Sequence, residues 1–286
     1  MSVVRLAGFR HHFESYEAAD ASEAAVYWHS SNDRAKDAVS ASFALLELER
    51  YLKRSGHTVL REGEAELVIR ILPYYETEWA ASFRSELRRA AAAQAERYVC
   101  RFPAMERDIY RIFAKQEEIV IVGATGVACL YGVYAYLRQI GFAFFAPGEE
   151  NERIPRLPRL TVPEGGFVLP SFPLRRMYAY KKNRADEALL DWFGKCGVNL
   201  WGAENLLPGM RKRGILLGSG NHDLLSVCGC RPDYCVSDPE TLSRIRRTIV
   251  DQLKKGCFRE TDVLDYLGGD MQPRCECERC RAIGNY

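Results

Sequence analysis

Cysteine is the residue type whose spacing most clearly suggests chemistry in this 286-residue sequence, which contains ten of them. Two clusters read Cys228-x-Cys230-x4-Cys235 and Cys275-x-Cys277-x-x-Cys280. Four thiolates brought together bind Zn²⁺ tetrahedrally at about 2.3 Å, and an all-cysteine set favours structural over catalytic zinc because it leaves no open coordination position. Free buried thiols, or disulfides in an exported protein, are the competing interpretations.

The elements that precede the clusters predict a compact α/β domain over residues 1–150. Apolar residues at helical spacing predict a helix over 35–56. A strand over Glu66–Leu72, a helix over 83–98, a strand over 117–124 and a helix ending at Gly141 follow. The GATG stretch at 123–126 is read as a tight strand-to-helix turn, because it lacks the spacing of a nucleotide-binding loop. No cluster of titratable groups lies between these elements, so we expect no active site in this domain.

A proline-rich stretch separates this domain from a second one. Six of the 12 prolines lie between 147 and 174, and we predict a linker over 151–173. Strands are then expected at 174–180, 197–203, 222–227 and from Val263, alternating with helices at 184–196 and after Asp238. Such alternation predicts parallel βαβ units over 174–286 and suits a barrel or a doubly wound sheet.

Two stretches resemble known families. The segment 119–150, IVIVGATGVACLYGVYAYLRQIGFAFFAPGEE, resembles the accessory N-terminal domain of alpha-glucuronidases and bacterial hexosaminidases. The run Cys235-Val-Ser-Asp-Pro-Glu240, then a helix, then Asp270 and the C-x-C-x-x-C tail resembles domain-of-unknown-function family 4838, whose members include glycoside hydrolase family 163. The resemblance implies an accessory α/β domain followed by the first half of a TIM-like (β/α) barrel. Relatives continue beyond this point and complete the barrel, so the chain is expected to be C-terminally truncated.

The resemblance also implies candidate site residues at the C-terminal ends of the expected strands, where barrel enzymes hold their catalytic groups. Asp270 follows two glycines and is the candidate catalytic carboxylate, the alternative being a turn cap. The candidate substrate-binding residues are His222, Trp201, Glu204 and Arg176. Glu204 is the one candidate in reach for a second carboxylate. A structural histidine, a core tryptophan and a solvated arginine are the competing readings of the other three.

The family pattern also selects four cysteines as ligands. Cys235, Cys275, Cys277 and Cys280 match it, whereas Cys228 and Cys230 are additional. We therefore expect one structural zinc ion that joins the loops after the third and fourth strands.

Bulk composition leaves the partner open. The net charge of +2 favours neither nucleic acid nor an anionic membrane, and the N-terminus lacks the features of a signal peptide, so a cytoplasmic protein is expected. The leading hypothesis is a glycoside hydrolase-type protein that acts on or binds glycans containing N-acetylhexosamine or uronic acid, and that is incomplete and inactive without a downstream polypeptide. The alternatives are a non-catalytic carbohydrate-binding module and a zinc-stabilised interaction module.

Overall fold

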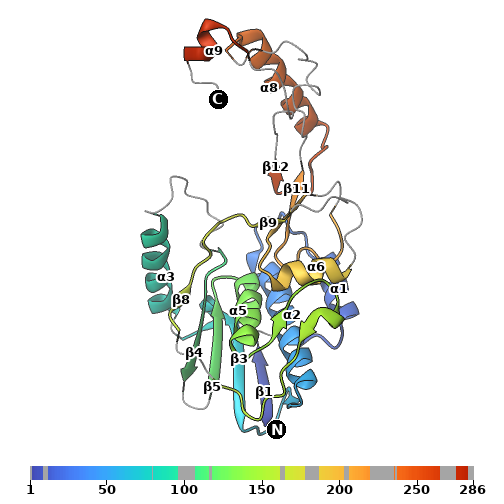
Figure 1. The fold of residues 1–286 in the computed structure, drawn as a ribbon, viewed down its shortest axis with the longest axis vertical. Helices are drawn as coiled ribbons and strands as arrows, with labels where there is room; N and C mark the ends of the chain where they lie inside the picture. The colour runs from blue at the N-terminus through green and yellow to red at the C-terminus, as the bar shows by residue number, and fades with distance from the viewer. Residues whose placement is uncertain are drawn as a thin grey trace. The chain divides into compact units, whose positions relative to one another are not determined.

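The protein is a mixed α/β fold, as its sequence predicts (Figure 1). The computed structural model describes residues 2–8, 12–78, 80–95, 107–115, 118–161, 165–177, 187–202, 206–219, 235, 237–264 and 275–282. The chain divides into two compact units. Unit 1 comprises Met1–Leu200 and Leu207–Ile215, and unit 2 comprises Trp201–Leu206 and Leu216–Tyr286.

Unit 1 is built on a six-stranded sheet with the order β2-β1-β3-β5-β4-β8. The strands are β1 (Val3–Gly8), β2 (Thr58–Leu60), β3 (Leu67–Pro73), β4 (Tyr110–Lys115), β5 (Glu118–Gly123) and β8 (Phe167–Val168). The β2, β1, β3 and β5 strands are parallel to one another, while β4 runs antiparallel to both β5 and β8. The strands predicted at 66–72 and 117–124 are confirmed as β3 and β5. The sequence analysis missed β1 and β4.

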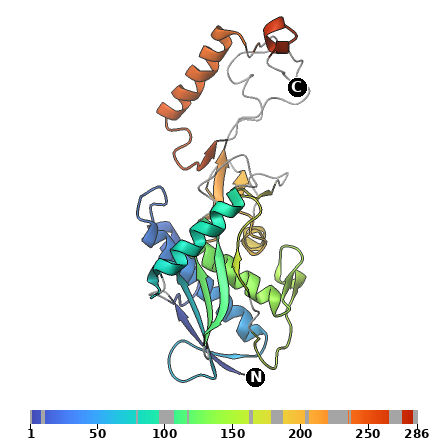
Figure 2. The same ribbon diagram turned by 90° about the vertical axis from the view of Figure 1, so that its left-hand side faces the viewer.

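Helices cover both faces of this sheet, which explains the apolar run in β5. The α2 (Asp33–Arg54) and α5 (Gly126–Gln139) helices pack on one face and α3 (Ala80–Ala95) packs on the other, while α1 (Tyr16–Ala25) contacts α2 and α6 (Glu187–Lys195) contacts α5. Ile119 and Ile121 of β5 join the core cluster that includes α2 and α5. The alternate residue Val122 packs in a second cluster with Phe83 and Leu87 of α3, the helix nearest the viewer in Figure 2. A strand buried on both faces requires apolar side chains in both directions.

The turn from β5 into α5 is held by a carboxylate from another helix. Thr125 caps α5 by accepting a hydrogen bond from the Ala128 amide at 3.1 Å. The Gly126 amide donates to Oδ1 of Asp37 at 2.7 Å. A side chain of the protein thus occupies the helix N-terminus, where a phosphate would bind in a nucleotide loop, and GATG is a structural turn.

Unit 1 continues well beyond residue 150. The short strands β6 (Ala143–Phe144) and β7 (Glu152–Arg153) form an antiparallel pair, and the unit also contains β9 (Arg176–Met177) and the 3₁₀ turns η1 (Tyr74–Glu76) and η2 (Glu149–Asn151). The expected linker 151–173 therefore includes two strands, β7 and β8, that pair within unit 1. The buried Glu23 carboxylate accepts hydrogen bonds from the amides of Gly209 at 2.8 Å and Lys212 at 3.0 Å. That residues 1–150 fold independently stays a prediction.

Unit 2 contains a parallel βαβ arrangement. Its elements are β10 (Leu200–Gly202), which begins at the last residue of the first segment of unit 1, β11 (Leu216–Ser219), α8 (Pro239–Lys254), β12 (Val263–Leu264) and α9 (Glu278–Ala282). β11 and β12 pair in parallel, with Gly218 opposite Val263, and α8 lies between them in sequence. Asp262 extends the pairing, because its amide donates to the Leu217 carbonyl at 3.0 Å and its carboxylate accepts from the Leu217 amide at 2.7 Å.

The third strand was expected at 222–227, a segment that lies outside the described residues. The structure instead places β11 at Leu216–Ser219, just before the expected segment. That residues 174–286 form the first half of a TIM-like barrel stays a prediction. None of the described helices is long and apolar enough to cross a membrane.

Candidate metal centre

Two segments of unit 2, one before α8 and one at α9, bring four cysteines together. Cys235 lies just before α8. The N-cap of this helix is Asp238, whose carboxylate accepts a hydrogen bond from the Thr241 amide at 2.9 Å. The Asp238 amide in turn donates to the Cys235 carbonyl at 3.0 Å, which fixes the cysteine against the start of the helix. Cys280 lies on α9, and Cys275 and Cys277 immediately precede that helix.

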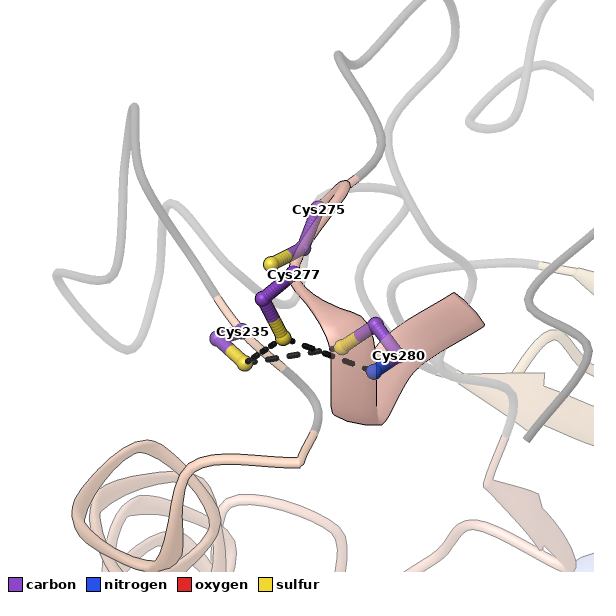
Figure 3. Close-up of side chains that lie close together, drawn as sticks. All are labelled: Cys235, Cys275, Cys277 and Cys280. Atoms are coloured by element: carbon purple, nitrogen blue, oxygen red, sulfur yellow. Dashed lines mark hydrogen bonds between the residues drawn. The ribbon is translucent and has the colours of Figure 1, made fainter. Parts of the chain in front are cut away.

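The four sulfur atoms converge on one point (Figure 3). All four lie within 4.8 Å of one another. The Sγ atom of Cys235 is 3.6 Å from that of Cys277 and 3.5 Å from that of Cys280. A tetrahedral zinc ion with bonds of about 2.3 Å would hold its ligand sulfurs about 3.8 Å apart. A disulfide needs about 2.0 Å between sulfurs, so the spacing fits metal coordination and not a covalent bond.

The electrostatics of the cluster favour thiolate formation at two of its members. Hydrogen bonds led by the Ser237 hydroxyl lower the pKa of Cys277 to about 6, with the Cys280 amide contributing from 3.4 Å. The same hydroxyl, 3.1 Å from its sulfur, lowers the pKa of Cys235. A backbone hydrogen bond from Cys277 lowers the pKa of Cys275, but the neighbouring sulfurs outweigh it and raise that pKa to about 12. Without a metal ion the cluster therefore retains a proton, and a bound cation would replace it.

Ser237 also contacts the cysteine cluster, and the sequence analysis did not single it out. Its Oγ atom lies 3.1 Å from the sulfur of Cys280 and 3.5 Å from that of Cys277, in addition to its contact with Cys235. A hydroxyl in this position can donate a hydrogen bond to a metal-bound thiolate and hold it in place. The signal in the sequence was weak, because a serine two residues after a cysteine is also an ordinary helix-start residue.

The structure brings together the four predicted cysteines but does not describe most of the predicted glycan-binding residues. Asp270, His222 and Glu204, together with the additional Cys228 and Cys230, lie outside the described residues. Trp201 is on β10 and is only 1% exposed. Arg176 is exposed on β9. The roles assigned to these residues stay predictions.

Comparisons with known proteins leave the family open. No family model matches the sequence, including the family 4838 model suggested by its motifs, and no curated protein sequence matches it. Among solved structures, the chain resembles glycoside hydrolases. These include a GH138 enzyme targeting pectin rhamnogalacturonan II (10% identity, 92% of this chain and 38% of that chain, TM-score 0.43). They also include CpGH84B, which is 13% identical over 86% of this chain and 41% of that chain, with a TM-score of 0.42. A third is the GH115 4-O-methyl-alpha-glucuronidase BtGH115A, which is 13% identical over 84% of this chain and 35% of that chain, with a TM-score of 0.44. The chain spans about two fifths of the length of these proteins.

Proposed function

We propose that this chain is a glycan-directed protein of glycoside hydrolase type whose second unit is held together by one structural zinc ion. The observation that carries the zinc part is the convergence of four cysteine sulfurs within 4.8 Å. Cys235, Cys275, Cys277 and Cys280 would all bind as thiolates and would fill the tetrahedral coordination sphere. The ion would supply cross-linking and not catalysis, because no position would remain for water or substrate.

The glycan part is supported by the sequence motifs at 119–150 and 235–280 and is compatible with the mixed α/β fold. In this proposal Asp270 is a catalytic carboxylate, and His222, Glu204 and Arg176 contact a sugar, whereas the buried Trp201 supports β10 from the core. The substrate would be a glycan that contains N-acetylhexosamine or uronic acid. Glycoside hydrolysis ordinarily requires two carboxyl groups on either side of the scissile bond. A further polypeptide would complete the barrel wall and supply what these residues lack.

A zinc-stabilised interaction module is the alternative that the cysteine cluster also favours. Such a module would use the metal to order a surface for assembly and would not recognise sugars. Glycan binding separates the two possibilities, since both predict the same metal site.

Two measurements on one preparation of the full chain test the proposal. Metal analysis after purification under reducing conditions should find one zinc ion per chain, and a metal-free, folded protein would contradict the zinc part. Binding to immobilised N-glycans, N-acetylglucosaminides and glucuronides should be detectable and should weaken in both His222→Ala and Asp270→Asn. Zinc without glycan binding would contradict the glycan part and leave the interaction module.

A further inference from the structure

Unit 1 contains a buried ionic network that no sequence motif indicated. At its centre is Glu47 of α2, whose side chain has no exposed surface. One of its carboxylate oxygens accepts a hydrogen bond from the Tyr16 hydroxyl, and the other accepts from the Tyr134 hydroxyl at 2.7 Å. Burial raises the pKa of Glu47, and Asp191 nearby raises it further.

Three cations surround this carboxylate. The side chains of Arg213, Lys195 and Arg50 are 2%, 4% and 18% exposed. Arg213 lies 3.4 Å from Asp191, which is also paired with Lys195. Arg50 lies 3.6 Å from Glu47 and forms an ion pair with Glu149 at 2.5 Å. Removing so many charges from water costs free energy, and the attraction within the ion pairs does not always compensate for it. Such networks are frequent where a site binds a ligand.

A cleft of about 580 Å³ opens directly onto the network. Its lining includes Tyr16, Arg50, Glu149, Glu187, Asp191 and Arg213. Clefts that hold small molecules in proteins usually measure roughly 300–1,000 Å³. All six residues belong to unit 1, so the cleft is separate from the metal centre.

Arg213 is an almost fully buried part of the cleft lining. Its side chain packs over the Phe43 ring at 4.9 Å, and Nη1 donates to the Gly209 carbonyl at 3.1 Å. Its Nε atom is buried and has no hydrogen-bond partner among the described residues. A buried donor left unpaired costs about 1–3 kcal/mol, so Arg213 is held in the cleft wall at a cost in stability.

We propose that this cleft binds a polyhydroxylated ligand of monosaccharide to disaccharide size that carries no negative charge. Three carboxylates, Glu149, Glu187 and Asp191, line it and can accept hydrogen bonds from hydroxyl groups. Among the side chains that line it, carboxylates outnumber guanidinium groups by three to two, and both guanidinium groups are already paired with carboxylates. A neutral sugar or an amino sugar fits this charge balance, whereas a uronic acid does not. The proposal rests on unit 1 alone and does not depend on the glycan site proposed for Asp270.

Ala188 offers a variant that blocks the cleft without entering the core. It lines the cleft and is exposed on the second residue of α6. Ala188→Trp should fill the opening. The matched control is Ala81→Trp, because Ala81 is an exposed alanine on α3 that does not line the cleft. Equal thermal melting of the two variants would show that both are folded.

The test is titration of the full chain with glucose, N-acetylglucosamine, glucosamine and glucuronate, followed by calorimetry and ligand-observed NMR. We expect saturable binding of the first three sugars and weaker binding of glucuronate. Ala188→Trp should weaken binding at least tenfold, Glu187→Gln should weaken glucosamine binding more than glucose binding, and Ala81→Trp should leave both unchanged. The proposal is overturned by the absence of saturable binding or by binding that survives Ala188→Trp. It is also overturned if Asp270→Asn removes the binding while Ala188→Trp does not, which would place the sugar at the other site.

Discussion

The sulfur of Cys235 lies 3.5 Å from the sulfur of Cys280, although 45 positions separate the two residues in sequence. The intervening chain includes the whole of α8 and β12. A metal bound at this point would join the two ends of that segment in the folded protein. Because its ligands are gathered only in the folded state, the free energy of metal binding would add to the free energy of folding.

Metal removal should therefore loosen unit 2 selectively. We expect an excess of a strong chelator to increase the rate of proteolytic cleavage within 235–282 at least tenfold, because the loop would lose its cross-link. Cleavage within the α2, β5 and α5 core of unit 1 should not change. Mass spectrometry of the fragments locates the cuts, and the same chelator saturated with zinc is the control. Equal cleavage with and without the free chelator would contradict the prediction.

Ser237→Ala should weaken metal binding without abolishing it. The substitution removes a hydroxyl that contacts the sulfurs of Cys235, Cys277 and Cys280 but leaves all four ligands in place. Loss of such a supporting hydrogen bond typically lowers metal affinity about 10–100-fold. Competition with a chromophoric chelator measures this change, and Ser243→Ala, at an exposed position of α8, should behave as wild type. An unchanged affinity would show that Ser237 does not support the site.

Gly126→Ala should destabilise unit 1. A Cβ atom at this position would lie 2.2 Å from the Asp37 carbonyl oxygen, and backbone on both sides leaves little room to relax. Overpacking of this kind typically costs about 1–3 kcal/mol in the free energy of unfolding. Urea denaturation followed by circular dichroism measures the loss. Gly166→Ala is the control, since no atom lies within 4 Å of its added Cβ. Equal stability of the two variants would contradict the prediction that the Asp37 backbone leaves no room for a side chain at position 126.

The chain by itself should not hydrolyse glycosides. The usual mechanism needs an acid and a nucleophile or base held in a water-excluded site. The proposal names Asp270 and Glu204 as the two candidate carboxylates and assigns the rest of the site wall to a further polypeptide. Assays with aryl N-acetylglucosaminides, aryl glucuronides and N-glycans should detect no turnover above background. Turnover by the wild-type chain that disappears in Asp270→Asn would show that this chain already holds the catalytic machinery.

The elements that the sequence predicted correctly are long or strongly apolar. The α2 and α5 helices carry apolar residues at helical spacing, and β5 is apolar on both faces because helices cover both sides of the sheet. The missed strands lack such signals. β1 has a charged Arg5 at its centre, and β11 is only four residues long and includes Gly218. Pairing with neighbouring strands, and not local propensity, makes these segments extended.

The cysteine cluster and the network around Glu47 also differ in how far the sequence could predict them. The cysteine cluster was predictable because its members are one residue type at short spacing, and because a family pattern selected Cys235 and not Cys228 or Cys230. The network around Glu47 was not predictable, because its members come from positions as distant as Tyr16, Asp191 and Arg213. Each is an ordinary polar residue in its own helix or loop, and only the packing of unit 1 brings them together.

X-ray absorption at the zinc edge tests the metal centre most directly. The full chain, purified under reducing conditions, should hold one zinc ion with four sulfur ligands at about 2.3 Å. Cys277→Ser should lose this signal or replace one sulfur by a lighter atom, while Cys257→Ser, at an exposed free cysteine, should retain all four. A spectrum with fewer than four sulfurs in the wild type, or no stoichiometric zinc in folded protein, would contradict the account.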